Sequence, residues 1–290
     1  MRIFEVSNIL NEQILFDIKS KNNKNFINKF HVIESNFTYK YKKKNYLIKN
    51  NFNHVALHQV NFEKLFNKPS IKLSRYFPFF DRNKYVWLNE AIQRNYLTDT
   101  IKANLRDDDI LIISDLDEII NFSNLDRILY YLKKYNFITV KLYQTMFFFN
   151  LFNSPENAGP PDWSYRIFIM YGKVFKRLRH TIDGLRIKGV QGILKDEVFC
   201  PDEYMGFHHS WVGDIDKIIY KINSYSHTYK DHKAVILDQN GKIDVKKIEE
   251  LLKNKISIMD NSKLYLDSTI NLLPEVLNIK KIYPQFFINN

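Results

Sequence analysis

Two aspartates stand directly after a short apolar run, where they could bind a metal ion. Asp115 and Asp117 follow Ile110-Leu111-Ile112-Ile113, a run typical of a strand buried on both faces of a parallel sheet. In open α/β sheets, ligands bind beyond the carboxyl ends of the strands. Residues two apart in an extended chain point to the same side, so both carboxylates face one site. Such a pair of oxygen ligands could hold Mg²⁺ or Mn²⁺ and leave coordination positions for a diphosphate.

A cation at this place would serve a reaction whose leaving group is a nucleoside diphosphate. The ion would neutralise the charge that develops on the phosphates as the bond to the leaving group breaks. Asp-x-Asp pairs are common, and turn or cap positions explain most of them. The apolar strand before Asp115 is the feature that favours a metal site here.

The elements that must position this pair alternate along the chain. Apolar runs predict strands at 3–6, 30–33, 54–60, 110–113, 137–143 and 165–171. Helical spacing predicts helices at 9–18, 87–105, 125–135 and 214–227. This alternation is typical of βαβ units, so we predict an α/β fold with a mainly parallel central sheet. Between the strand predicted at 165–171 and the helix predicted at 214–227, residues 184–192 are predicted to form a basic, glycine-bearing loop.

The last part of the chain has a different pattern. From Asp244 onward the sequence is helical and rich in lysine. We therefore predict one main domain over residues 1–243 and a helical C-terminal extension over 244–290, packed on the same domain.

Composition restricts the class of protein and its partners. The 290 residues are 45% hydrophobic and 15% aromatic, which suits a chain with a substantial core. The single cysteine, Cys200, excludes an intramolecular disulfide, and the N-terminus lacks a signal-peptide pattern, so we expect a cytoplasmic protein. The net charge of +11 reflects either base composition or a surface for an anionic partner, such as acidic lipid at the inner face of the membrane. No nucleic-acid-binding signature accompanies the charge, so no nucleic acid partner is expected.

The acidic segment also resembles a known family. Ser114-Asp115-Leu116-Asp117-Glu118-Ile119 is similar to the S-D-[VL]-D-E-I segment of glycosyltransferase family 17. The best-known members of that family are β-1,4-mannosyl-glycoprotein N-acetylglucosaminyltransferases, which add the bisecting sugar to N-glycans. Further segments that resemble the family occur in the same order: Asn11-Glu12, residues 32–38, Asn89-Glu90, residues 93–95, residues 206–211 and residues 221–227.

The resemblance implies a GT-A fold, a UDP-sugar donor, Mn²⁺ or Mg²⁺ as cofactor, and inversion at the anomeric carbon. It implies transfer of N-acetylglucosamine or another hexose to a glycan or lipid-linked glycan, in surface polysaccharide or lipopolysaccharide synthesis. Phe207 replaces a usual Trp and Ile120 a usual Pro, which bears on the acceptor rather than on the chemistry. Two alternatives stay open: a metal-dependent nucleotidyltransferase, and a non-catalytic protein that binds glycans or lipid surfaces.

Several further site residues follow from the resemblance and from residue type. His208 is expected to complete the metal site of Asp115 and Asp117 and to contact the donor, whereas His209 should face the opposite side of its strand. The donor site is also expected to include Arg94, gripping phosphate or orienting the carboxylates, and Glu34, accepting from ribose or uracil. The acceptor side is expected to include Trp163 and Trp211, with packing against the sheet as the alternative for Trp163.

An inverting transfer also needs a carboxylate that takes the proton of the acceptor hydroxyl. Asp196 and Glu197 follow the glycines Gly189 and Gly192, in an order seen in many GT-A enzymes. We therefore predict that one of these two carboxylates is the catalytic base.

Overall fold

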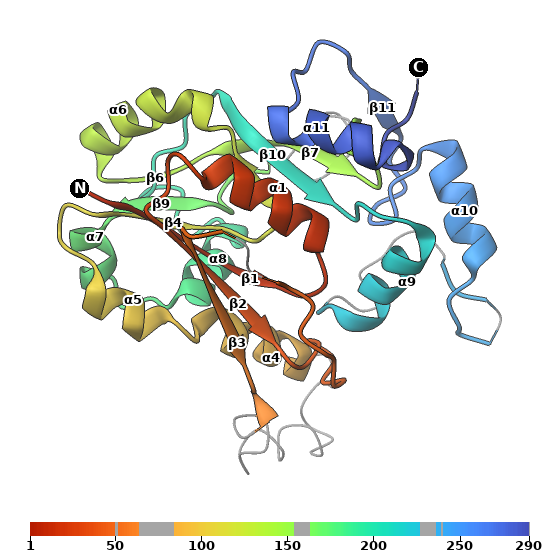
Figure 1. The fold of residues 1–290 in the computed structure, drawn as a ribbon, viewed down its shortest axis with the longest axis horizontal. Coiled ribbons are helices and arrows are strands. Elements are labelled where there is room, and N and C mark those ends of the chain that lie inside the picture. Colours follow the sequence, from red (N-terminus) through yellow and green to blue (C-terminus); the bar gives the residue numbers. More distant parts are fainter. Residues whose placement is uncertain (50–51, 64–83, 154–162, 227–235, 239, 290) are drawn as a thin grey trace.

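Two β-sheets form the frame of the molecule (Figure 1). The computed structural model describes residues 1–49, 52–63, 84–153, 163–226, 236–238 and 240–289. The first sheet has six strands in the order β3-β2-β1-β4-β9-β6. Their bounds are β1 (Ile3–Ile9), β2 (Lys29–Ser35), β3 (Val55–Val60), β4 (Ile110–Ile113), β6 (Phe137–Thr139) and β9 (Phe168–Tyr171).

The direction of the strands makes this sheet mixed. Four strands, β3, β2, β1 and β4, are parallel to one another. β9 runs antiparallel to both β4 and β6. The α/β class is confirmed, but the expectation of a mainly parallel sheet is corrected. β4 belongs to the parallel part of the sheet, and Asp115 and Asp117 follow its carboxyl end.

The second sheet has five strands in the order β11-β8-β7-β10-β5. Their bounds are β5 (Glu118–Ile120), β7 (Lys141–Met146), β8 (Leu151–Asn153), β10 (Tyr204–Ser210) and β11 (Leu264–Leu266). β10 is parallel to β7 and antiparallel to β5, so this sheet is mixed too. The single strand predicted at 137–143 is two strands in different sheets, with the fully buried Val140 between them.

Helices cover both faces of the first sheet (Figure 1). One face carries α1 (Gln13–Asn23) and α6 (Leu125–Tyr135), and the other α4 (Lys84–Asn95), α5 (Thr98–Asn104), α7 (Gly172–Arg177) and α8 (Ile182–Val190). Side chains of β4 alternate between these layers: Ile110 and Ile112 join one apolar cluster, and Leu111 and Ile113 join the other. Burial on both faces explains why the β4 run is apolar throughout.

Several predicted boundaries differ from the structure. β1 extends to Ile9 and α1 begins at Gln13, and the helix predicted at 87–105 is the separate helices α4 and α5.

The loop predicted at 184–192 is mostly helix. Two of its glycines serve the helix. The Gly184 amide donates to the N-cap side chain of Thr181 (3.2 Å), and a Cβ at Gly189 would lie 2.3 Å from the Tyr165 carbonyl oxygen. Gly189 therefore allows the helix to pack closely.

The C-terminal part of the chain is attached to the same core. It contains α9 (Ile215–Ser224), α10 (Val245–Asn254), α11 (Pro274–Ile282) and the 3₁₀ turn Pro284–Phe286. Another 3₁₀ turn, Phe122–Asn124, lies earlier in the chain, directly before α6. Asp214 caps α9 as predicted, its side chain accepting from the Lys217 amide (2.9 Å). α11 packs against α1 (Figure 1).

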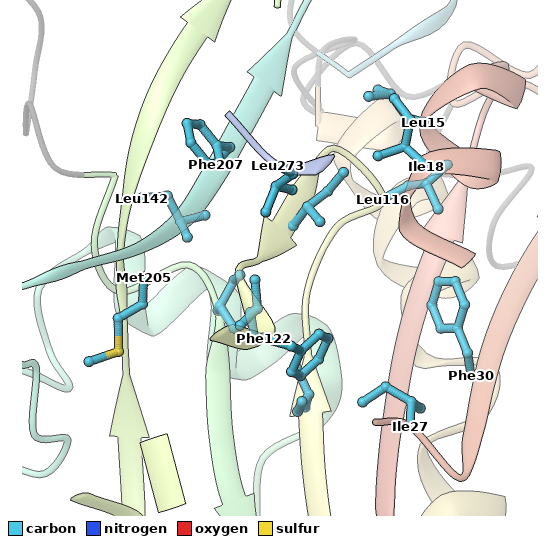
Figure 2. Packing of buried hydrophobic residues seen from close by; sticks show 14 of the residues in the cluster. Leu15, Ile18, Ile27, Phe30, Leu116, Phe122, Leu142, Met205, Phe207 and Leu273 are labelled. Carbon is cyan, nitrogen blue, oxygen red and sulfur yellow. The ribbon is translucent and has the colours of Figure 1, made fainter. Parts of the chain in front are cut away.

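The apolar core joins the two sheets. Figure 2 shows Leu15 and Ile18 of α1 close to Leu116, with Phe207 of β10 and Leu273 in the same cluster. The loop that carries the acidic pair is thereby anchored at Leu116, which is 2% exposed. Within the described ranges, no helix has the length and apolar character to cross a membrane.

Candidate active site

A cleft of about 780 Å³ opens where β4 ends, and both aspartates of the acidic pair line it. The residues from Asp115 to Glu118 form a tight turn. The Glu118 amide donates to the Asp115 carbonyl oxygen (3.2 Å), and the Asp115 amide donates to Glu118 Oε2 (2.7 Å). The backbone of this turn therefore fixes the direction of the two aspartate side chains.

Asp115 accepts hydrogen bonds from two arginines. Arg94 donates to both carboxylate oxygens, from Nη2 to Oδ2 (2.8 Å) and from Nε to Oδ1 (3.3 Å). Arg186 Nη2 donates to Oδ2 at 2.6 Å. Arg94 also forms salt bridges with Glu90 (2.6 Å) and Asp183 (3.1 Å), so it lies at the centre of an acidic cluster. Of the two actions predicted for Arg94, this geometry matches the orientation of a carboxylate.

Asp117 faces a lysine and a histidine. Its Oδ2 lies 3.3 Å from Lys221 Nζ and 3.6 Å from His208 Nε2. Burial would raise the pKa of the Asp117 carboxyl, but Lys221 and His208 outweigh burial and hold the pKa well below its usual range. The carboxylate of Asp117 is therefore charged over the whole ordinary pH range.

The two neighbouring histidines of β10 lie in different environments. His208 lines the cleft, and the ring of Trp163 stacks on it (3.9 Å between centroids, 15° between planes). Trp163 is held in turn by its Nε1, which donates to Glu118 Oε1 (3.0 Å). His209 is fully buried, its Nδ1 lies 2.8 Å from Thr145 Oγ1, and burial followed by the charge of His208 lowers its pKa to about 3.

Arg166 lines the cleft with its guanidinium. It lies over the Trp163 ring (4.5 Å to the centroid) and forms no salt bridge with any residue in the described part of the chain. Burial, and then the charge of Arg186, lower the pKa of Arg166. A bound anion would offset these effects, because it would add an opposite charge beside the guanidinium.

Trp211 also lines the cleft, where it packs edge-to-face against Tyr225 (5.0 Å). With Trp163, both aromatic residues predicted for the acceptor side are therefore at the cleft.

Three residues predicted for the site lie elsewhere. Glu34 is fully buried, and its carboxylate accepts from the backbone amides of Leu47 (2.6 Å) and Ile48 (3.3 Å), so it holds the 44–48 segment. Asp196 and Glu197 are exposed on the turn after α8 and are not part of the cleft lining.

The structure adds four basic residues that the sequence prediction did not place at the site: Arg166, described above, and Lys19, Arg186 and Lys221. Lys19 of α1 is 1% exposed, and its Nζ donates to the carbonyl oxygens of Asp115 (2.7 Å) and Glu118 (2.8 Å). Arg186 pairs with both Asp115 and Glu118, and Lys221 pairs with Asp117. Lys221 had a signal, since it begins the family-like segment 221–227, whereas Lys19 had none in a lysine-rich chain.

Comparison with known proteins gives one sequence match and several structural likenesses. The family model described as "Glycosyltransferase family 17" matches residues 1–167. No curated protein matches the chain in sequence.

Among solved structures, the chain is similar to S. aureus TarS 1-349 (10% identity, TM-score 0.34, 73% of this chain and 60% of that chain). It is also similar to galactosyltransferase LgtC in complex with donor and acceptor sugar analogs (13% identity, TM-score 0.33, 69% and 73%). A second structure of S. aureus TarS gives 11% identity and a TM-score of 0.34 over 79% of this chain and 41% of that chain. The chain thus spans less than two thirds of the TarS 1-349 structure.

Proposed function

The chain belongs to glycosyltransferase family 17, and from this premise we propose that it transfers a sugar from a UDP-sugar donor to a hydroxyl group of a glycan. We propose a GT-A type architecture, with residues 1–243 as the catalytic domain and 244–290 as its extension. The observation that carries the proposal is the cleft beyond β4, where charged groups suited to a nucleoside diphosphate converge.

Arg166, which forms no salt bridge with a described residue, supports a diphosphate at this place. Arginine binds phosphate through two parallel N–H groups, and a partly desolvated guanidinium binds an anion more strongly than an exposed one. Arg186 and Lys221 line the same cleft, so three basic side chains from three elements can surround one diphosphate. The Trp163 ring below Arg166 holds the guanidinium in place.

Asp117 and His208 are the residues that would hold a divalent cation. A carboxylate oxygen and an imidazole nitrogen, 3.6 Å apart and both at the cleft, are suitable donors for Mn²⁺. No cluster of three or more potential metal ligands occurs within the described residues, so diphosphate oxygens and water would complete the shell. When bound, the cation supplies charge neutralisation for the leaving diphosphate.

We assign Asp115 a different task from Asp117. Asp115 accepts three hydrogen bonds from Arg94 and Arg186, so two guanidinium groups already share its charge and make it the weaker candidate ligand. Asp115 instead orients Arg94 and Arg186. The sequence-based prediction that Asp115 is a ligand can be tested separately, because Asp115→Asn and Asp117→Asn should differ in Mn²⁺ affinity.

For the substrates, we propose N-acetylglucosamine or another hexose as the sugar and a surface glycan or lipid-linked glycan as the acceptor. Family membership and the two tryptophans at the cleft support these assignments. The net charge of +11 would favour contact with an anionic membrane.

The experiment is UDP binding and UDP release, with and without Mn²⁺. Calorimetry should detect Mn²⁺-dependent binding of UDP, and UDP-N-acetylglucosamine, UDP-glucose and UDP-galactose should be compared for turnover. Arg166→Met should weaken UDP binding by about 1.5–3 kcal/mol, the range for a hydrogen bond to a charged group. A protein that binds no UDP in the presence of Mn²⁺ would contradict the proposal and favour the non-catalytic alternative.

A further inference from the structure

One carboxylate at the cleft, that of Asp260, has no basic partner among the described residues. The other carboxylates of the cleft lining each pair with a cationic side chain: Glu90, Asp115 and Asp183 with Arg94, and Asp117 and Glu12 with Lys221. Asp260 lines the same cleft and, as far as the described residues extend, forms no salt bridge. A proton acceptor must be ionised and must have a lone pair that no cation occupies.

Asp260 is held rigidly while one of its oxygens stays open. Its Oδ1 accepts from the amide of Ser262 (3.1 Å) and from the hydroxyl of Ser262 (2.8 Å), whereas Oδ2 has no hydrogen bond to a described residue. The loop itself is closed by the Ser257 amide, which donates to the Ser262 carbonyl oxygen (2.8 Å), and by the Asn261 amide, which donates to Ser257 (3.0 Å). A base fixed in this way keeps its orientation without a cationic partner.

The 257–262 loop lies beside the part of the cleft that carries neutral polar groups. It leads into β11, where Leu264 pairs with Asn153 of β8. Asn153 Nδ2 donates to Gln144 Oε1 (2.7 Å), and its own buried Oδ1 has no partner among the described groups. Asn153, Gln144 and Trp211 all line the cleft, and together they offer amide groups and an aromatic face. Such a lining suits the hydroxyl groups and ring of a neutral sugar better than a diphosphate.

We propose that the 257–262 loop and the Asn153–Gln144 pair form the acceptor site, and that Asp260 is the catalytic base. This inference rests on the proposed function. The acceptor oxygen forms a bond to the anomeric carbon while the bond from that carbon to the diphosphate oxygen breaks. The electron pair of the broken bond leaves with UDP, and the hydroxyl proton moves to Asp260 Oδ2. The base therefore comes from the C-terminal segment and not from the turn after α8.

The test uses the full chain, Mn²⁺, and the same three UDP-sugars with water as acceptor. Asp260→Asn keeps the hydrogen bonds from Ser262 but cannot take a proton, so UDP release should fall about 10²–10⁴-fold. The affinity for UDP should be unchanged, which shows that the variant is folded and binds the donor. Asp267→Asn is the matched control, because Asp267 accepts in the same way from the amide (2.8 Å) and hydroxyl (2.6 Å) of Thr269 but lies outside the cleft lining.

Azide separates a base from a structural residue. Azide attacks without losing a proton, so it should restore UDP release in Asp260→Ala and form a glycosyl azide, with a bond from nitrogen to the anomeric carbon. If turnover of Asp260→Asn stayed within about threefold of wild type, the inference would be overturned while the proposed function would stand. The same holds if turnover fell in Asp196→Asn or Glu197→Gln instead. A loss in Asp260→Ala that azide does not rescue would overturn it as well. A wild-type protein that releases no UDP from any donor would contradict the proposed function, and the inference with it.

Discussion

The ammonium of Lys19 donates hydrogen bonds to the backbone of the turn formed by residues 115–118. Its removal is the most direct test of how the site is positioned. Lys19 Nζ lies within 3.2 Å of five oxygen atoms: Ser7 Oγ, Ser114 Oγ, Glu5 Oε1 and the carbonyls of Asp115 and Glu118. The two carbonyls are the first and last of the turn. We predict that Lys19→Met lowers the free energy of unfolding and weakens Mn²⁺-dependent binding of UDP.

The size of the effect follows from burial. Lys19 and Glu5 are each 1% exposed, so Lys19→Met leaves a buried carboxylate without its counter-charge. Removing one partner of a buried ion pair costs about 3–5 kcal/mol. Glu5 keeps hydrogen bonds from Ser114 Oγ (2.6 Å) and Asn23 Nδ2 (2.5 Å), which limit the loss to the lower part of that range. Because domains have only about 5–15 kcal/mol of stability, the variant should still fold.

Urea unfolding followed by tryptophan fluorescence measures the loss, and two further variants make it specific. Lys21→Met changes an exposed lysine of the same helix and should stay within about 0.5 kcal/mol of wild type. Glu5→Gln combined with Lys19→Met should be less destabilising than the sum of the single variants, by at least about 1 kcal/mol. Lys19→Arg should recover part of the stability, since it keeps the charge.

A loss below about 1 kcal/mol for Lys19→Met, the cost of an ordinary hydrogen bond, would refute the reasoning. So would strict additivity with Glu5→Gln, because the two charges would then not interact. If Lys19→Met lost stability but bound UDP with unchanged affinity, the ammonium would support the fold without positioning the turn.

Three further predictions concern the charged residues of the site and the core. Asp115→Ala should cost about 1–3 kcal/mol in urea unfolding, since it removes one carboxylate partner from each of Arg94 and Arg186, whereas Asp117→Ala should cost less stability but lose Mn²⁺ binding. Equal Mn²⁺ affinity in both variants would contradict this. His208→Ala should weaken Mn²⁺ binding in calorimetry, whereas His209→Ala should mainly lower stability; the reverse order would show that the assignment to the two faces is wrong. Burial, followed by a neighbouring histidine, lowers the pKa of His31 from 6.5 to about 4, so its contribution to stability is present above pH 6.5 and is lost as the pH falls toward 4. His31→Gln should flatten the pH dependence of the unfolding free energy in that window by up to about 1.4 kcal/mol per pH unit, and an unchanged slope would contradict the assignment.

The sequence predicted the central strand and the place of the acidic pair, because both depend on local patterns. The run 110–113 is apolar since both faces of β4 are covered, and ligand binding at a strand end needs no knowledge of distant contacts. Alternation along β10 likewise predicted that His208 and His209 lie on opposite sides.

What the sequence could not predict depends on long-range pairing. Glu34 follows the expected strand, but the backbone amides of Leu47 and Ile48 fold back onto it and use its carboxylate. The Asp196–Glu197 turn has the expected order of residues, yet it lies at the end of a helix whose glycines serve packing. Asp260 has no local signal in the sequence, because the long-range pairing of β11 with β8 brings this part of the C-terminal segment beside the cleft.

The charge of the cleft differs from the charge of the whole chain, and this difference supports a requirement for the cation. The protein carries +11, but the described residues that line the cleft include six carboxylates and four basic side chains, an excess of two negative charges. A diphosphate brings further negative charge into a partly desolvated space, where repulsion is stronger than in water. Arg94 and Arg186 cannot offset it fully, because Asp115, Asp183, Glu90 and Glu118 already share them. One divalent cation on Asp117 and His208 would cancel the excess and leave Arg166 to bind the diphosphate.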